Sequence, residues 1–255
     1  MKTNNLSRFG FAAAIMLTLI VSSCSKSNDV GQNENEVPGG QNNVLTGVKL
    51  TKSTVFGDII TDNNGRSLYF FANDPKGTPN CVGGCLTVWP VFYKENPSIG
   101  TGLDAKDFGV VTRSDNSKQT TYKGWPLYYY SQDTQAGDVK GDKVGEVWFV
   151  AKSDYTIMVS KAQLVGNDAK NYLPSGVEGT GASEYLTDAY GRTLYLFEPD
   201  TKNNNTFTSD NFSNNGIWPI YTSAAIGSIP SILDAKLFTF TEVTNTATNA
   251  KFTQV

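Results

Sequence analysis

Short apolar runs broken by turn-forming residues set the pattern of this chain. Runs rich in Tyr, Phe, Val, Thr and Ile are separated by Gly, Asn, Asp or Pro at intervals of about 8 to 12 residues. This pattern predicts an all-β fold of tandem repeats, made of short antiparallel strands and hairpins in a small barrel or sandwich. Strands are expected at residues 147–151, 156–160 and 237–243, and helical turns only at 162–164 and in two Leu-Asp-Ala-Lys segments.

One string within this pattern occurs three times, in the form Gly-x-x-Leu-Tyr-x-aromatic-x-x-Asp. Its tyrosine, second aromatic residue and aspartate are Tyr69, Phe71 and Asp74, then Tyr128, Tyr130 and Asp133, then Tyr195, Phe197 and Asp200. In an extended strand, Tyr69 and Phe71 point to one face and Leu68 and Phe70 to the other. Both faces are apolar, so we expect a central strand that is covered on both sides.

Two interpretations of the repeated Tyr and Asp residues remain open. Each Asp can cap the turn after its strand while each Tyr packs in the core, and recurrence favours this structural role. Alternatively, the Tyr and Asp groups converge on a pocket between repeats, where carboxylates and carbonyls would suit Ca²⁺. The nearby acidic residues Asp138, Asp142 and Glu146 lack the spacing of an EF-hand loop, so no metal ligand is assigned.

A longer duplication divides the chain. Residues 61–69 match residues 187–195, and in both the Asp-x-x-Gly step, at Asp62 and at Asp188, predicts a hairpin turn. We therefore expect a first repeat domain at 47–160 and a second at 161–255, which carries an extra loop at 174–182. The first domain holds two copies of the string and the second holds one. The second repeat is therefore expected to be incomplete, with an unpaired edge near Val255.

The N-terminal residues predict secretion and lipid anchoring. A basic start is followed by an apolar run at 9–21 that is short for a membrane span, and the run ends in Val-Ser-Ser-Cys, which resembles a lipobox. Residues 1–23 are thus predicted to be a lipoprotein signal peptide, and Cys24 the lipidated residue. Because Ser25 rather than Asp follows, the outer membrane is the expected destination. Residues 24–46 contain little that could be buried and are expected to form a flexible linker.

The remaining cysteines and the overall composition limit the chemistry. Cys81 and Cys85 form an even pair in an oxidising compartment, which favours a structural disulfide, with redox or metal use as the alternative. The chain has no histidine, which excludes Ser-His-Asp and Cys-His hydrolases. Its formal net charge of −3 and the lack of a basic stripe make nucleic-acid binding unexpected. No cofactor is expected.

The tryptophans and carboxylates leave two further alternatives. Trp-Pro at a strand edge usually closes a core, although tryptophans can also form a stacking platform for sugars. The four are Trp89, Trp125, Trp148 and Trp218. A carboxylate pair could in principle hydrolyse glycosidic bonds, but no two acidic residues are singled out by the pattern.

Taken together, these motifs resemble the secreted-repeat lipoprotein family with tandem Tyr-x₄-Asp motifs, whose function is unknown. The resemblance extends from about residue 48 to 255, with two departures: the third copy has no cysteines between Asp200 and Trp218, and Lys143 and Glu146 interrupt a Gly-rich stretch. It implies secretion and repeats but no reaction. We therefore expect a non-catalytic binding or structural module on the cell envelope. Its expected partners are the membrane, through Cys24, and an unidentified protein or glycan.

Overall fold

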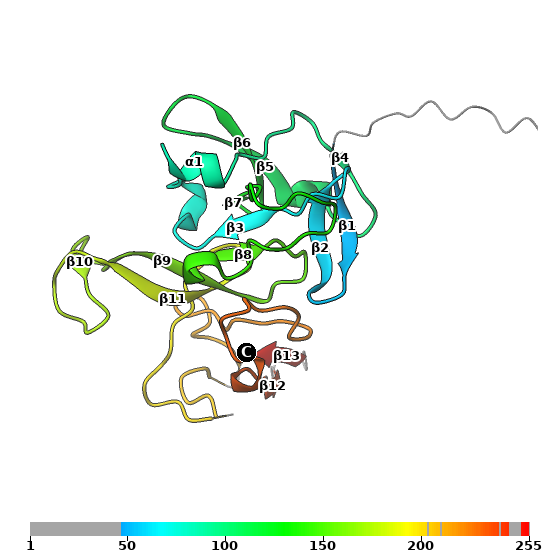
Figure 1. Cartoon of the computed structure of the whole chain (residues 1–255). Coiled ribbons are helices and arrows are strands. Elements are labelled where there is room, and N and C mark those ends of the chain that lie inside the picture. Colours follow the sequence, from blue (N-terminus) through cyan, green and yellow to red (C-terminus); the bar gives the residue numbers. More distant parts are fainter. Residues whose placement is uncertain (1–46, 203, 210, 240, 245–250, 255) are drawn as a thin grey trace, which may run out of the picture. The chain divides into compact units, whose positions relative to one another are not determined.

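The computed structural model describes residues 47–202, 204–209, 211–239, 241–244 and 251–254 (Figure 1). Strands dominate, as the sequence predicts. The strands are β1 (Gly47–Ser53), β2 (Gly57–Asp62), β3 (Tyr69–Phe71), β4 (Ser98–Ile99), β5 (Phe108–Thr112), β6 (Lys118–Tyr122), β7 (Trp125–Pro126), β8 (Trp148–Val150), β9 (Ile157–Val165), β10 (Asn171–Tyr172), β11 (Ala182–Asp188), β12 (Thr241–Thr244) and β13 (Lys251–Gln254). The helical segments are α1 (Cys85–Val88), η1 (Pro75–Gly77), η2 (Ala105–Asp107), η3 (Val144–Glu146) and η4 (Ala235–Leu237). The predicted signal peptide, Cys24 and the whole predicted linker lie outside the described residues, as does Val255.

Each copy of the repeated string follows an antiparallel hairpin. The hairpins are β1–β2, β5–β6 and β9–β11, and each ends a few residues before the Leu-Tyr pair of its copy. The predicted Asp-x-x-Gly turns are confirmed. Asp62 Oδ1 accepts the backbone N–H groups of Asn64 and Arg66, both at 2.9 Å, and Gly65 adopts a φ of 83°. Asp188 and Gly191 repeat this geometry, with a glycine φ of 77°.

The first two copies form one composite sheet. β3, from the first copy, pairs antiparallel with β8, which carries Trp148 of the second copy. On its other side Tyr69 forms an antiparallel bridge with Tyr128, and Tyr128 in turn bridges to Val91. Each copy therefore places its tryptophan segment beside the Leu-Tyr segment of the other copy.

The two faces of this composite sheet bury different side chains. Leu68 and Phe70 are 0% and 2% exposed and join one hydrophobic cluster, whereas Tyr69 and Phe71 join a second one. The prediction of a strand covered on both faces is therefore confirmed for the first copy. Alternation of side chains along the strand thus places a separate hydrophobic cluster on each face of this sheet.

Four details differ from the sequence-based expectation. The five small sheets among the described residues do not close into a barrel. Residues 162–164 lie within β9, because pairing with β11 outweighs their weak helical preference. The strand expected from residue 237 starts only at Thr241, after η4, and the short helix α1 was not predicted. Both Leu-Asp-Ala-Lys turns are confirmed as η2 and η4, each capped by its aspartate.

The expected domain boundary after residue 160 falls inside β9, which runs without interruption from Ile157 to Val165. The expected extra loop at 174–182 connects β10 to β11. Over the part of the chain that the structure describes, none of the helices has the length and apolar character needed to span a bilayer.

Candidate functional site at the contact between the first two copies

The repeated tyrosines and aspartates of the first two copies bond to each other crosswise. The Tyr69 hydroxyl donates to Asp133 Oδ2 at 2.6 Å, and the Tyr128 hydroxyl donates to Asp74 Oδ2, also at 2.6 Å. All four side chains are buried, none more than 5% exposed. We call this pair of hydrogen bonds the Tyr–Asp exchange.

Backbone pairing explains why the exchange is reciprocal. The Tyr69 N–H donates to the Tyr128 carbonyl at 2.9 Å, and the Tyr128 N–H donates to the Tyr69 carbonyl at 3.1 Å. Two residues that exchange both bonds in an antiparallel pair are related by a local two-fold axis. That axis sends each tyrosine toward the loop of the opposite copy, where the opposite aspartate lies.

Each aspartate also closes the loop of its own copy. Asp74 Oδ1 accepts the Asn80 N–H at 2.6 Å, and Asp133 Oδ1 accepts the Lys140 N–H at 3.0 Å. One carboxylate oxygen therefore orders the loop, and the other receives the tyrosine. The aspartates thus have the turn-capping role that was one of the two interpretations of the sequence. They also meet the tyrosine of the opposite copy, but in a buried contact and not in the pocket that the other interpretation required.

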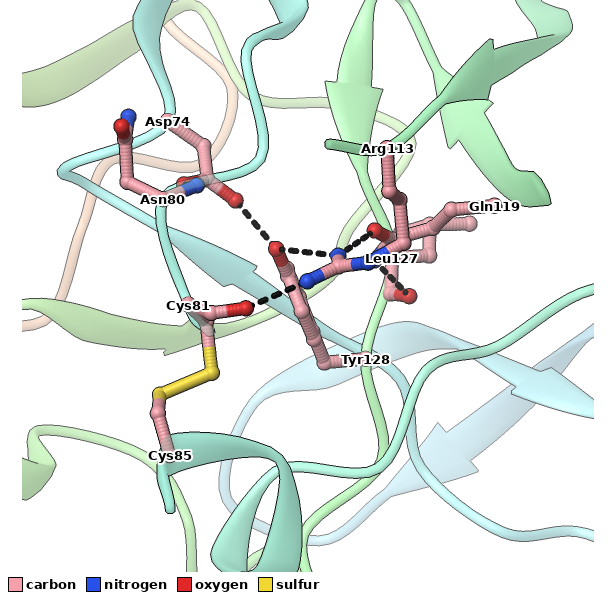
Figure 2. Close-up of a disulfide and its surroundings, with 8 residues drawn as sticks. All are labelled: Asp74, Asn80, Cys81, Cys85, Arg113, Gln119, Leu127 and Tyr128. Atoms are coloured by element: carbon pink, nitrogen blue, oxygen red, sulfur yellow. Dashed lines mark hydrogen bonds between the residues drawn. A yellow bond between two sulfur atoms is a disulfide. The ribbon is translucent and has the colours of Figure 1, made fainter. Parts of the chain in front are cut away.

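A buried arginine completes the Asp74 side of the exchange (Figure 2). Arg113 is 3% exposed, and its guanidinium donates to Gln119 Oε1, to the Cys81 carbonyl and, at 3.4 Å, to the Tyr128 hydroxyl. Gln119 in turn donates to the Leu127 carbonyl at 2.8 Å. The positive charge thus lies one hydroxyl away from the Asp74 carboxylate, which offsets part of the cost of burying both charges.

The predicted disulfide is confirmed and lies beside this network. Cys81 and Cys85 are bonded, with their Cα atoms 5.4 Å apart. The bond closes the turn that leads into α1, and the Cys81 side chain is 1% exposed. By ordering this turn, it fixes the carbonyl that receives Arg113 (Figure 2).

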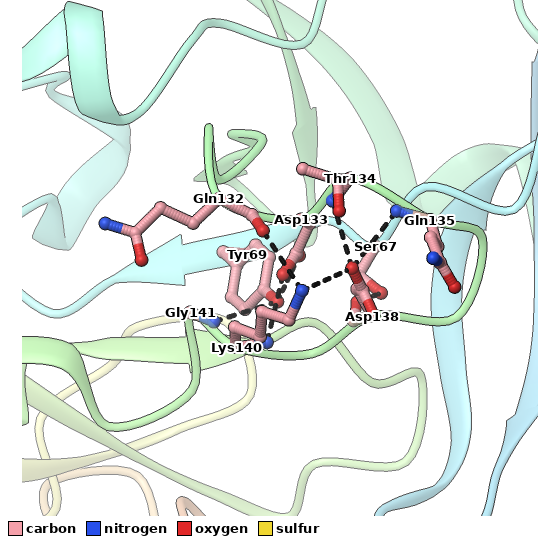
Figure 3. A network of polar contacts seen from close by, with 9 residues as sticks. All are labelled: Ser67, Tyr69, Gln132, Asp133, Thr134, Gln135, Asp138, Lys140 and Gly141. Carbon is pink, nitrogen blue, oxygen red and sulfur yellow. Dashed lines mark hydrogen bonds and ion pairs between the residues drawn. The ribbon is translucent and has the colours of Figure 1, made fainter.

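No arginine among the described residues bonds to the Asp133 side of the exchange, which is more polar at its edge (Figure 3). The Gly141 N–H donates to the Tyr69 hydroxyl at 3.3 Å, so this oxygen both donates and accepts. The exposed side chain of Lys140 pairs at 2.8 Å with the partly buried carboxylate of Asp138. A side chain on Gly141 would collide with the Tyr69 and Trp89 rings, since a Cβ there would lie 2.8 Å and 2.9 Å from them.

The same two-fold relation orders four aromatic rings. Trp89 and Trp148 stack on each other at 3.7 Å between ring centroids. Phe71, from the first copy, stacks on Trp148 of the second at 4.0 Å, and Tyr130, from the second, stacks on Trp89 of the first at 4.4 Å. Both tryptophans are 4% exposed. They form core rather than an open platform, and Trp125, which is 2% exposed, is also core.

Burial favours the neutral forms of the tyrosines and aspartates of the Tyr–Asp exchange by raising their pKa values. Burial raises the pKa of Asp74 to about 6 and also raises the pKa of Asp133. Burial, reinforced by the aspartate that each contacts, raises the pKa values of the Tyr69 and Tyr128 phenols far above their usual range. Both tyrosines therefore remain protonated donors at physiological pH.

The four side chains of the Tyr–Asp exchange are buried and lie apart from the hollow that the described residues form elsewhere. A hollow lined by Val110, Thr121, Trp125 and Tyr190 contains none of the residues of the Tyr–Asp exchange. The acidic residues Asp138 and Asp142 do not act together. Asp142 accepts the Val150 N–H at 2.9 Å, whereas Asp138 caps the turn at residues 134–135. Among the described residues, no three His, Cys, Asp or Glu side chains are grouped to hold a metal ion.

The third copy differs from the other two. Asp200 Oδ1 accepts the Thr206 N–H at 2.6 Å, as its counterparts do in their loops. However, Tyr195 and Trp218 are 73% and 51% exposed, so the predicted covered strand is wrong for this copy and Trp218 is not core. Within the described residues, no hydroxyl donates to Asp200 Oδ2 from a tyrosine, and the Tyr195 hydroxyl has no hydrogen-bond partner.

Sequence reasoning missed the crosswise partners and the roles of Arg113 and Gln119. One signal was present for the partners. Trp89 follows Tyr69, and Trp148 follows Tyr128, by the same number of positions. This matched spacing identifies each tryptophan as part of its copy and predicts a symmetric arrangement of the two copies. No comparable signal distinguishes Arg113 from an ordinary surface arginine.

In the comparison with known proteins, the two paired copies match the same family model. Residues 50–93 and 109–152 each match a family described as a secreted repeat of unknown function. The matched segments are the first and second copies, so the tandem repeats and the family resemblance are confirmed there, while the third copy lies outside them. No curated protein and no solved structure matches the chain.

Proposed function

We propose that this protein is a lipid-anchored component of the bacterial cell envelope, in which paired repeats form a rigid, non-catalytic binding or structural module. The observation that carries the proposal is the Tyr–Asp exchange. Its hydroxyls and carboxylates bond to one another and to the backbone. A catalytic carboxylate must reach a substrate, whereas these two are buried and have their oxygens occupied.

The matched family supports the envelope location, since its repeats are described as secreted. The lipobox-like sequence before Cys24 and the polar linker add the anchor. Lipidation with more than one acyl chain would hold the chain stably on a membrane. In this arrangement residues 24–46 act as a spacer between the outer membrane and the repeats.

Mass spectrometry and cell fractionation test the anchor. The N-terminal peptide of the purified protein should start at Cys24 and carry acyl chains, and the protein should fractionate with the outer membrane. The Cys24→Ser variant should lose the acylated peptide. An intact, unmodified Cys24 in membrane-extracted protein would contradict the anchor.

A substrate panel tests the absence of catalysis. The full chain is incubated with envelope polysaccharides, and new reducing ends are measured together with thermal unfolding. We expect no turnover, and a lower melting temperature for Asp74→Asn and Asp133→Asn. The matched control is Asp58→Asn, at an exposed ion pair with Lys52. Turnover that either buried-site variant abolishes, and the control retains, would replace this proposal with the glycan-acting enzyme.

The surroundings of the disulfide favour a structural role for Cys81 and Cys85 over the alternative role in redox or metal handling. Cys81 is buried, and its carbonyl is held by Arg113, an environment that suits a structural bond more than an exchanging one. Mass analysis with and without a mild thiol reductant separates the two roles. We expect a fully oxidised pair that resists the reductant and carries no metal. Rapid, reversible reduction of the folded protein would favour the redox role.

A further inference from the structure

The third copy already has the internal structure of a paired copy. Its Leu194 N–H bonds to its hairpin at the Leu186 carbonyl at 2.9 Å, as the Leu68 N–H does to Ile60 at 3.1 Å. Its aspartate accepts a loop N–H six residues further on. Contacts that require only one copy are therefore formed.

The ring contact between tyrosine and tryptophan within each copy is also present three times. The Tyr69–Trp89 centroids are 5.5 Å apart with planes at 74°, and those of Tyr195 and Trp218 are 5.2 Å apart at 70°. The second copy has the same edge-to-face contact, at 5.2 Å and 89°. The third copy thus presents its tyrosine and tryptophan in nearly the geometry used by the paired copies.

Contacts that require a second copy are missing from the third. No described residue donates to or accepts from the Tyr195 backbone, whereas Tyr69 and Tyr128 exchange both bonds. Among the residues that the structure describes, the Tyr195 hydroxyl and Asp200 Oδ2 lack the partners of the exchange, and no tryptophan stacks on Trp218. Its apolar side chains remain at the surface: Tyr195, Leu196, Phe197, Ile217 and Trp218 are between 41% and 89% exposed. Exposed apolar patches of this kind mark interaction sites.

We propose that the third copy is a self-association surface, on which two molecules of this chain pair through Tyr195, Asp200 and Trp218 as the first and second copies pair within one molecule. A second copy of the chain is the partner favoured by symmetry. The exchange has a local two-fold axis, and each participant supplies one tyrosine, one aspartate and one tryptophan. The third copy supplies all three, so its surface is complementary to itself.

Such a dimer would build three sets of contacts across its axis. The two Tyr195 backbones would exchange their N–H and C=O bonds, and each Tyr195 hydroxyl would donate to Asp200 of the other molecule. The two Trp218 rings would stack as Trp89 and Trp148 do. This inference rests on the proposed function, because it names the partner of the same non-catalytic repeat.

Light scattering coupled to size-exclusion chromatography tests the proposal on the full chain, in mild detergent if it is acylated, with protein mass separated from detergent mass. We expect a concentration-dependent dimer. Tyr195→Phe should raise its dissociation constant about a hundredfold or more, because two-fold symmetry removes two charge-assisted hydrogen bonds with one substitution. Trp218→Ala should also abolish the dimer at micromolar concentrations.

Tyr190→Phe is the matched control. Tyr190 is also an exposed tyrosine, at 56%, but it lies outside the repeated string, so the dissociation constant should stay within about twofold of the parent. Unchanged circular dichroism and melting of monomeric Tyr195→Phe would show that the variant folds.

Three results would overturn the proposal. The first is a monomer at all concentrations up to about 100 µM, and the second is a dimer that still forms in both the Tyr195→Phe and the Trp218→Ala variants. The third is that a repeat from a different protein binds to the third copy. None of these would affect the proposed non-catalytic role, which fails only on turnover. Turnover by a chain that still dimerises would contradict the non-catalytic role and would not affect the proposed dimer.

Discussion

Copies with the same residues occupy opposite environments in this protein. Tyr69 and Tyr128 are fully buried, whereas Tyr195 is 73% exposed, and Trp89 and Trp148 are buried, whereas Trp218 is half exposed. The hairpin, the aspartate-closed loop and the tyrosine–tryptophan contact are common to all three. The difference shows that one copy is half of a core. Local sequence forms the half, and a second copy determines whether it becomes interior or surface.

Removing a stacked tryptophan should give the largest contrast. Trp148→Ala deletes a buried ring that stacks on both Trp89 and Phe71, and should lower the free energy of unfolding by about 3–5 kcal/mol. Trp218→Ala, measured where the chain is monomeric, should cost about 1 kcal/mol or less. Urea titration followed by far-UV circular dichroism measures both. Equal losses would mean that Trp218 is as important to the monomer core as Trp148.

Acid should stabilise the protein through Asp74. Its pKa is raised from 3.8 to about 6 by burial, so the folded state binds more protons than the unfolded state between these values. The stabilisation is fully present below about pH 3.8 and is lost as the pH rises through about 6, a difference of about 3 kcal/mol. Asp133, whose pKa is also raised, acts in the same direction.

Urea titrations at several pH values from 4 to 7 test this effect. Asp74→Asn cannot titrate, so its free energy of unfolding should vary less with pH over that window than that of the parent. A constant loss is also expected, because the Asn80 N–H and the Tyr128 hydroxyl bond to different oxygens of Asp74, and in asparagine one of these positions becomes an NH2 group that cannot accept. If parent and variant have parallel pH profiles, Asp74 does not carry the effect.

Much of each copy could be predicted from its sequence, and the pairing of copies could not. Alternating side chains predicted the two faces of the strand at Tyr69, and the Asp-x-x-Gly step predicted both turns, because these depend on neighbours a few residues apart. The partner of Asp74 lies 54 residues away along the chain. Local pattern does not determine such a partner, because it depends on the register in which two distant segments pair. For the same reason, the exposure of Tyr195 could not be predicted, because it depends on whether a second copy pairs with the third.

Deleting single hydroxyl groups isolates the exchange itself. Tyr128→Phe keeps the buried ring and removes the donor to the Asp74 carboxylate, which should cost about 1.5–3 kcal/mol. Tyr195→Phe in the monomer should change the free energy of unfolding by less than about 0.5 kcal/mol. A double-mutant cycle of Tyr128→Phe with Asp74→Asn, in urea, should give a clear coupling energy. Additive losses would indicate that the two side chains act independently.

The disulfide distinguishes the first copy from the other two. Replacing Cys81 and Cys85 together by alanine opens a loop of about five residues, for which chain entropy predicts a loss of about 2 kcal/mol. The second and third copies close the corresponding loops without cysteines, so the first copy should still fold and keep its Asp74–Asn80 hydrogen bond. We therefore expect a lower urea midpoint with an unchanged slope, since a similar surface is exposed on unfolding. A variant that loses cooperative unfolding would show instead that Arg113 needs the ordered Cys81 carbonyl to remain buried. In that case the disulfide would be a requirement of the paired core itself.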